Sequence, residues 1–456
     1  MESLPKYGQV AYAIGQLGWS TLINILGLQL VYFYLPPEEA KMTALITQQK
    51  FFIILNAITL IASGGRLIEF FTDPYIAGKS DTFSSKFGRR IPFMAIGCLP
   101  SALFCCLMFW PPDSSPTTTN LVWIIVMQLL FYVSFSFYVM PHNALLIELG
   151  HNEHERLNLS TWISLTYALG IVAAAAGTSL WEPIMNQFNV PKTTAIQYSV
   201  CIIAAFAFLC MLVPVFVINE KKYTISNPSN QPIFESLKRT FRNPLFRIFL
   251  LSDAAYWMGL TIIETGLVYY VTVLLHLPES IIFPMLTGMI VTSFLLYPVV
   301  NMLARRFSRK SLILTAFLVF AGLFCLICGL GYYPLPQVVQ GMIVMVLAGF
   351  PVAFLGILPN TILADIAELD TLETGNSAEG MYFAARTMLM KLAQTGGIIV
   401  FAALLTLGKD ASNSIGIRLT GVAGFLMCAI AYWIFRFYNE RKISEKINKL
   451  RNVGRV

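Results

Sequence analysis

Charged residues are scarce in this chain. Only 12% of its 456 residues are Asp, Glu, Lys or Arg, whereas a soluble domain carries about 25%. The sequence is instead 56% hydrophobic, with a mean hydropathy of +0.67. A soluble fold of this size cannot hide so much apolar surface from water. The composition therefore excludes a soluble globular protein and indicates a membrane protein.

The sequence also lacks the motifs of common hydrolases and metalloenzymes. It has no HExxH and no GxSxG motif, and its four histidines are not spaced as ligands on one helix. All eight cysteines lie in apolar segments and none has metal-ligand spacing beside a histidine, which is typical of small core residues. We therefore expect neither an enzyme nor a resident cofactor.

Apolar segments of membrane-spanning length recur along the whole chain. A spanning helix needs about 20 residues, and twelve segments meet this requirement. They cover residues 10–35, 51–77, 91–110, 120–148, 159–182, 196–218, 245–275, 281–303, 311–332, 337–363, 381–407 and 415–438. The sequence therefore predicts an all-α membrane protein with twelve transmembrane helices.

Basic residues are distributed unevenly between the two sides of these predicted helices. With both termini in the cytoplasm, nearly all Lys and Arg outside the apolar segments fall on the cytoplasmic side. Those that fall on the other side are Lys41, Lys50, Lys192, Lys409 and Arg418. This asymmetry follows the positive-inside rule and predicts a multi-pass protein of the cell membrane with both termini inside. It also explains the net charge of +7 by contacts with the lipid bilayer, so we expect no nucleic-acid partner.

The longest polar break, at residues 219–243, separates six predicted helices from the next six. A basic loop at 86–90, after the second helix, has a counterpart at 305–310, after the eighth. This layout predicts a duplicated transporter with its site at the midplane between two pseudo-symmetric bundles. The predicted parts are an N-terminal bundle at 1–218, a cytoplasmic loop at 219–244, a C-terminal bundle at 245–438 and a basic cytoplasmic tail at 439–456.

Two carboxylates interrupt the second apolar segment. Glu69 and Asp73 are four residues apart, so a helix projects both from one face, and Arg66 lies three residues before Glu69. Charges at membrane depth are costly, so such residues usually face protein or a water-filled path. Small hard cations prefer several oxygen ligands, and Thr72 adds a hydroxyl. We predict a monovalent-cation site here, with a structural Arg66–Glu69 salt bridge as the alternative.

The predicted C-terminal bundle also carries charges inside apolar segments. Arg386 and Lys391 of the eleventh segment are candidates to neutralise the acids of the second, as a charge pair that breaks when the cation or solute binds. The alternative for both residues is that the side chain extends to the membrane surface (snorkelling) or packs against the acidic loop before this segment. Three roles are open for Glu264 of the seventh segment. It lines the central cavity, it pairs with Arg386, or it is protonated and structural. Asp253, nearer the cytoplasmic end, is predicted to be structural.

An acidic stretch, residues 365–373, precedes the eleventh segment on the cytoplasmic side. Asp365 and Glu368 then face the two basic loops, at 86–90, which contains Arg89 and Arg90, and at 305–310. Salt bridges between them are a candidate cytoplasmic gate, although each exposed pair contributes little by itself. A solvated acidic surface is the alternative.

Two motifs resemble those of a known family. The first is Arg66-x-x-Glu69-x-x-x-Asp73-Pro74-x-x-x-Gly78, followed by the basic loop at 86–90. The second runs from Asp365-Ile366-x-Glu368 through 379–383 to Thr387 and Lys391. In these motifs the chain resembles the glycoside–pentoside–hexuronide:cation symporters of the major facilitator superfamily, which are related to sodium-dependent lysolipid symporters. The resemblance implies a major facilitator fold and transport coupled to a cation.

The resemblance also implies roles for individual residues. In that family the cation site uses two acids of the second helix and a hydroxyl of the fourth, with a lysine of the eleventh helix nearby. These positions correspond here to Glu69, Asp73, Ser136 and Lys391, and Thr72 stands in place of a nearby asparagine. Because Glu69 is longer than the usual aspartate, the choice between sodium, proton and lithium stays open.

The sugar-binding positions differ from those of the family. A lysine–aspartate pair in the first helix is replaced by Trp19-Ser20, and the acid of the fourth helix by Val139. A reshaped pocket therefore includes Trp19, Ser20, His142, Asn143, Glu264 and Thr387 as candidates. His142 either hydrogen-bonds a solute or packs between helices.

We expect a secondary active transporter in which sodium drives symport of a sugar, a glycoside or a similar small polar solute by alternating access. The alternative is sodium-coupled symport of a lysolipid or other amphiphile, because Glu264-Thr265-Gly266 resembles a span-seven motif of the lysolipid symporters. A sensor that has lost transport is a third interpretation. A monomer is the expected state.

Overall fold

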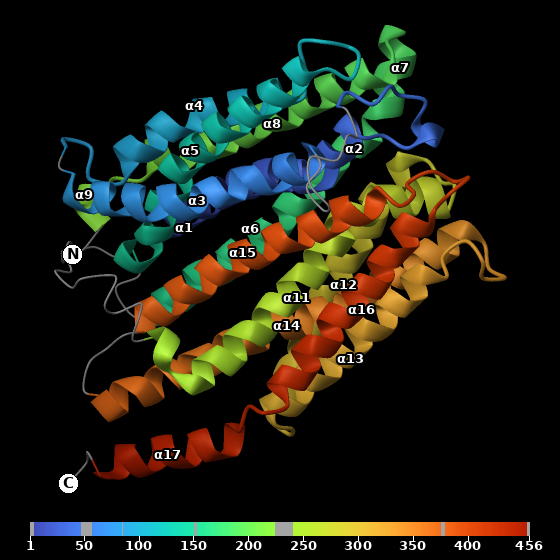
Figure 1. Ribbon diagram of the computed structural model, residues 1–456. Coiled ribbons are helices and arrows are strands. Elements are labelled where there is room, and N and C mark those ends of the chain that lie inside the picture. The colour runs from blue at the N-terminus through green and yellow to red at the C-terminus, as the bar shows by residue number, and fades with distance from the viewer. Residues whose placement is uncertain are drawn as a thin grey trace. The chain divides into compact units, whose positions relative to one another are not determined.

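The computed structural model describes residues 4–46, 57–83, 85–149, 153–223, 240–374 and 379–453. All regular elements in these ranges are helices (Figure 1). A helix satisfies its own backbone N–H and C=O groups, which lipid cannot do, so this is the expected solution for so apolar a chain. Eleven helices in the described ranges are long and apolar enough to cross a membrane. Together with α3 (Ala57–Thr82), they match the twelve predicted segments.

The chain divides into two compact units. Unit 1 comprises Met1–Ser229 with two segments from later in the chain, Leu267–Leu286 and Lys409–Ser412. Unit 2 comprises Asn230–Gly266, Thr287–Gly408 and Asn413–Val456. The main division falls within the predicted central loop, of which 224–239 lies outside the described residues. The predicted domain boundaries do not include the two C-terminal segments that join unit 1.

The helices of the N-terminal half belong to unit 1. They are α1 (Lys6–Ile25), η1 (Leu26–Leu30), α2 (Val31–Tyr34), η2 (Glu38–Ala40), α3, α4 (Ile91–Met108), α5 (Thr118–Leu149), α6 (Glu153–Ser179), α7 (Trp181–Phe188), α8 (Lys192–Val217) and α9 (Glu220–Tyr223). Here α5 packs on both α3 and α4, and α1 packs on α6 and α8. These contacts build the surroundings of the predicted cation site.

The remaining helices begin with α11 (Pro244–Tyr269), η3 (Tyr270–Leu274), η4 (Glu279–Ile281) and α12 (Ile282–Ala304). They continue with α13 (Arg309–Cys328), α14 (Gln337–Thr374), α15 (Glu379–Leu405), α16 (Ile415–Phe435) and α17 (Glu440–Val453). In unit 2, α13 packs on α14 and α16, and α17 on α14. The predicted basic tail is thus largely the helix α17, whose Ile443 and Ile447 are buried.

Both halves contain the same local irregularities. The first span carries a π-helical segment, η1, and the seventh carries another, η3. Each of these spans is followed by a short 3₁₀ turn, η2 or η4, which begins after a proline, Pro37 or Pro278, with a glutamate. An extra residue in a helix costs hydrogen-bond geometry, so its recurrence at matching places supports an internal duplication.

A second repeated feature is a glutamate that caps a distant helix. Glu220, 2% exposed, accepts hydrogen bonds from the backbone N–H groups of Arg89 (2.7 Å), Arg90 (2.8 Å) and Ile91 (3.1 Å) at the start of α4. Glu440 accepts from the N–H groups of Arg309 (3.2 Å) and Lys310 (2.9 Å) at the start of α13. A carboxylate at a helix N-terminus binds unpaired N–H groups and favours the helix dipole. The two basic loops are therefore fixed in the same way.

Candidate functional site

The predicted cation site lies where α3 approaches α5. Gly65 makes this approach possible, because a Cβ atom at that position would lie 2.0 Å from a ring carbon of Tyr132. Glu69 and Asp73 follow about one and two turns further along α3, on the same side of the helix. Pro74 lies inside the helix without breaking it. The small residue thus brings the carboxylate-bearing part of α3 close to α5.

Three predicted ligands are joined by hydrogen bonds. The Ser136 hydroxyl donates to Asp73 Oδ1 at 2.6 Å. The Thr72 and Ser136 hydroxyls lie 3.0 Å apart, and Thr72 donates to the carbonyl of Ile68 at 3.1 Å. An O–H···O⁻ bond of this length is typical of a charge-assisted hydrogen bond. The structure therefore brings together one carboxylate and two hydroxyl groups from two helices.

Glu69 adds a second carboxylate one helical turn from Asp73. It is 4% exposed, whereas Asp73 is half-buried. Arg66 lies on the same helix, but its side chain is outside the described part of the chain, so the Arg66–Glu69 alternative stays open. Two carboxylates with two hydroxyls form the donor set that a hard monovalent cation prefers. Within the described residues, no group of three or more His, Cys, Asp or Glu side chains is arranged to hold a metal ion.

The predicted pocket residues of unit 1 differ in their exposure. Trp19 is partly exposed, with its ring 5.9 Å from both Phe135 and Tyr167, and Asn143 is exposed. Ser20 is fully buried, and its hydroxyl lies 3.3 Å from the Tyr167 carbonyl, to which it donates. Trp19 and Asn143 therefore reach the surface of this unit. Ser20 lies in its packed interior, and its predicted contact with a solute stays a prediction.

His142 is also fully buried. Its ring stacks on Tyr12 at 4.2 Å and on Tyr138 at 5.6 Å. Its Nε2 lies 3.0 Å from the Tyr12 carbonyl, and the Tyr12 hydroxyl donates to the His142 carbonyl at 2.8 Å. Of the two interpretations left open by the sequence, interhelical packing is the one that this arrangement matches.

Gln16 is a residue that sequence reasoning missed. It lies three positions before Trp19 and is 3% exposed. Its Oε1 and the indole Nε1 of Trp19 are both buried without a hydrogen-bond partner among the described residues. Buried polar atoms normally have a partner, so this edge of α1 has unused hydrogen-bonding capacity. The signal was available, since an amide three residues from an indole shares its helix face.

In unit 2, Arg386 pairs with Asp253. Arg386 Nε and Nη2 donate to the two carboxylate oxygens of Asp253 at 2.8 and 2.9 Å, and Nη1 donates to Asn360 Oδ1. Asp253 is 5% exposed, so this bidentate pair compensates a buried charge. The structural role predicted for Asp253 fits this geometry, while Asn360 was not among the predicted residues.

The other predicted residues of unit 2 are more accessible. Thr387 is exposed, and Glu264 and Lys391 are half-buried. All three lie in the spans α11 and α15, where polar exposure favours a water-filled path over lipid. The predicted charge pair between Lys391 and the acids of α3 stays a prediction.

The predicted cytoplasmic gate residues have partners within their own units. Arg90 is 5% exposed, and its Nη1 donates to Ser80 Oγ at 2.6 Å. Asp365 accepts a hydrogen bond from Arg309 Nη2 at 2.5 Å. Arg89 and Glu368 are half-buried. The Arg309–Asp365 pair joins the acidic stretch to the basic loop at 305–310, as the sequence suggested. The Arg90–Ser80 pair was not predicted, and the gate that includes Arg89 and Arg90 stays a prediction.

Comparison with known proteins agrees with this fold. The sequence pattern of the family described as MFS/sugar transport protein matches residues 11–439. The chain belongs to this family. Its membership confirms the resemblance to the glycoside–pentoside–hexuronide:cation symporters of the major facilitator superfamily. As a member of this family, the protein is a multi-pass membrane transporter and not an enzyme.

Two distant relatives extend over nearly the whole chain. An isoprimeverose transporter of Lactiplantibacillus pentosus is 23% identical, over 97% of this chain and 91% of its own length. A raffinose carrier protein of Pediococcus pentosaceus is 23% identical, over 98% of this chain and 72% of its own.

Two solved transporters share the fold. A bacterial homologue of the human lysosomal transporter Spinster, inward-facing and unoccupied, has a TM-score of 0.67 at 12% identity, covering 98% of this chain and 99% of that one. A mutant form of the nucleoside transporter NupG also gives 0.67 at 13% identity, covering 95% and 99%. At such low identity these likenesses establish the twelve-helix fold alone.

Proposed function

We propose that this transporter is a symporter that moves a sugar or glycoside together with a monovalent cation, with sodium preferred over proton or lithium. The observation that carries the proposal is the Thr72–Ser136–Asp73 cluster beside the buried Glu69. Such a set of oxygens suits a small hard cation. The protein would act as a monomer in the cell membrane, with both termini in the cytoplasm.

The proposed coupling begins with repulsion between the two carboxylates. A bound cation relieves this repulsion and so favours the arrangement that binds solute. We assign the opposing positive charge to Lys391, because the Arg386 guanidinium already binds Asp253 and Asn360. Each charge that moves inward through 100 mV releases about 2.3 kcal/mol, which can drive accumulation of a neutral solute.

The solute class follows from the relatives and from the Trp19 region. Sugars present apolar C–H faces and hydroxyl edges, and binding sites commonly combine aromatic rings with a few polar groups. The partly exposed indole of Trp19 offers an aromatic ring, and Gln16, three residues away, offers a polar group. Asn143 and Thr387 are further candidate contacts, as proposed from the sequence. Glu264 favours an amphiphile instead, as in the lysolipid alternative, so both classes belong in the test.

The test is uptake into proteoliposomes under an imposed inward sodium gradient. Isoprimeverose, raffinose and a lysophosphatidylcholine serve as labelled solutes, and potassium replaces sodium in the control. We expect saturable uptake of at least one of the two sugars that depends on sodium. Uptake of the lysolipid alone would select the alternative, and absence of saturable uptake for all three would reject both.

The cation site has its own test in the same assay. Asp73→Asn keeps the shape of the side chain and removes its charge, so it should abolish the stimulation of uptake by the cation. Uptake in this variant that responds to sodium as the wild type does would reject the site.

A further inference from the structure

Unit 1 contains a buried carboxylate that the proposed transport mechanism does not use. Glu279 lies in η4, between the seventh and eighth spans, and is 8% exposed. By sequence it belongs to the C-terminal half, yet residues Leu267–Leu286 fold into unit 1. Its partners come from the N-terminal half: Tyr32 donates to Glu279 Oε1 at 2.6 Å, and Lys192 forms an ion pair with it. A buried carboxylate is tolerated only with partners of this kind.

Aromatic rings surround this ion pair. Tyr32 stacks on Trp181 at 5.8 Å and meets Tyr269 edge-on at 5.7 Å. The Lys192 ammonium lies 6.0 Å from the ring centroids of both Tyr32 and Trp181, within reach of a cation–π attraction. Trp181 is itself held by a 3.0 Å hydrogen bond from Nε1 to Ser199 Oγ. The partners of Glu279 are therefore themselves held by contacts with neighbouring residues.

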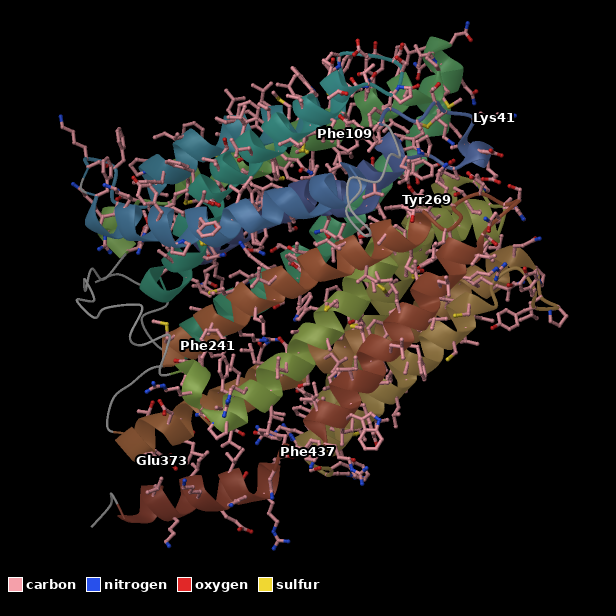
Figure 2. The ribbon with its side chains drawn as sticks, in the orientation of Figure 1. Lys41, Phe109, Phe241, Tyr269, Glu373 and Phe437 are labelled. Carbon is pink, nitrogen blue, oxygen red and sulfur yellow. The ribbon has the colours of Figure 1, made fainter. Side chains whose placement is uncertain are left out.

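Two more hydrogen bonds join residues 267–286 to the N-terminal half of the chain. The Tyr269 hydroxyl donates to the Leu35 carbonyl at 2.8 Å, and Ser179 Oγ to the Ser280 carbonyl at 3.2 Å. Figure 2 labels Tyr269 and Lys41 near one another at the end of unit 1 away from the N-terminus.

The second C-terminal segment of unit 1, residues 409–412, is attached at the chain that follows α2. Lys409 Nζ donates to the Pro36 carbonyl at 2.7 Å, and the Glu38 N–H donates to Asp410 Oδ1, also at 2.7 Å. Both segments that the C-terminal half contributes to unit 1 are thus held by polar contacts.

The charge pattern predicts that this end lies on the non-cytoplasmic side. Lys192 and Lys409 are two of the five basic residues that the positive-inside rule leaves outside. Their contacts supply a reason for that exception, because both bind groups of the other half of the chain. In a transporter that alternates between its two sides, a contact across the halves at one end must break whenever that end opens.

We propose that Glu279 is the latch of an outer gate, held by Lys192 and Tyr32, and that its release precedes opening of the non-cytoplasmic side. An ion pair suits this role because water can hydrate both charges once they separate, which offsets much of the lost attraction. Apolar side chains in a contact of the same area would gain no such hydration when they separate. The proposal rests on the proposed transport by alternating access, and it assigns a positioning residue outside the cation and solute sites.

The experiment uses a cross-link that reports closure without requiring transport. Cysteines replace Ser179 and Ser280, whose contact spans the two segments, in a background where the native cysteines are replaced by serine or alanine. A protease site in the central loop makes the intrachain disulfide visible, because the two cleaved halves then stay joined on a non-reducing gel. We expect rapid cross-linking with a mild oxidant in the presence of Glu279. The disulfide should also block uptake, and a reductant should restore it.

Glu279→Gln should slow this cross-linking about tenfold, since it removes one charged partner of a two-state contact. Glu182→Gln, an exposed acid on α7, is the matched control and should leave the rate unchanged. The exchange Lys192→Glu with Glu279→Lys should restore the rate if the protein folds and the pair acts as a latch.

An unchanged rate in Glu279→Gln, or full uptake by the cross-linked protein, would overturn the proposal. If neither sugar is taken up but Glu279→Gln still slows cross-linking, the proposed solute fails while the latch stands.

Discussion

Ser136 is the residue on which the proposed cation site most depends. Its hydroxyl contacts both Asp73 and Thr72, so it connects the side chains of α3 to α5. Glu69 and Asp73 lie on one helix and need a group from another helix to complete a coordination shell. Ser136 is therefore the group of α5 that connects the acid Asp73 of α3 to the proposed site.

Ser136→Ala should raise the cation concentration for half-maximal uptake about tenfold, because the loss of one hydrogen bond or ligand to a charged group corresponds to roughly 1.5 kcal/mol. The maximal rate at saturating cation should change much less. Ser134→Ala is the control, since Ser134 donates only to the Leu130 carbonyl of its own helix among its described contacts. Equal cation dependence in both variants would contradict the assignment.

At the scale of elements, the glutamate caps explain how the basic loops are held. Glu220 follows the sixth span and caps α4, and Glu440 follows the twelfth and caps α13. Each carboxylate connects the last helix of a half to its third. The start of a membrane helix has N–H groups that no lipid can satisfy, so such a cap has more value here than at a solvated helix end.

Glu220→Gln should lower the apparent midpoint of thermal unfolding, measured in detergent at a fixed scan rate. The charge-assisted bonds to the start of α4 are worth about 1.5–3 kcal/mol each when made to a charged group, and glutamine retains only part of this. Glu440→Gln should act in the same direction, because its geometry is equivalent. Exposed Glu182→Gln should not shift the midpoint, and a Glu220→Gln protein as stable as that control would refute the capping role.

For the whole molecule, a bound cation should stabilise the folded state. A ligand that binds only the native protein at 100 times its Kd adds about 2.7 kcal/mol. Sodium should therefore raise the unfolding midpoint relative to choline at the same ionic strength, and the rise should be absent in Asp73→Asn. A solute that is co-transported should raise it further only when sodium is present. An equal midpoint in sodium and choline for the wild type would count against sodium as the coupling ion.

Much of the architecture could be predicted from the sequence because lipid imposes strong rules. The length of the apolar segments predicted the helices, and the polar break at 219–243 predicted the division near the middle of the chain. The acids of α3 were visible as candidates because charge is rare in such a segment. The duplication was visible only in the loop pattern, whereas the structure adds the π-helical segments η1 and η3 and the two glutamate caps.

The partners of the side chains were harder to predict. Arg386 binds Asp253, where the sequence offered Glu264 as a partner. Ser20 and His142 pack inside unit 1, while Trp19 and Asn143 reach its surface. The association of Glu279 with Lys192 and Tyr32 joins segments that are far apart in the chain. None of these pairs follows from spacing along one helix.

The sequence by itself determined which segments are long and apolar enough to cross a membrane and which residues share a face of their own helix, because hydropathy and the 3.6-residue period are local properties. The tertiary structure alone decided which helix faces pack against one another. That choice depends on how closely two helices can approach, as Gly65 shows against Tyr132, and on which buried charge finds a partner within hydrogen-bonding distance. Both are properties of packing between distant segments, which no single segment encodes.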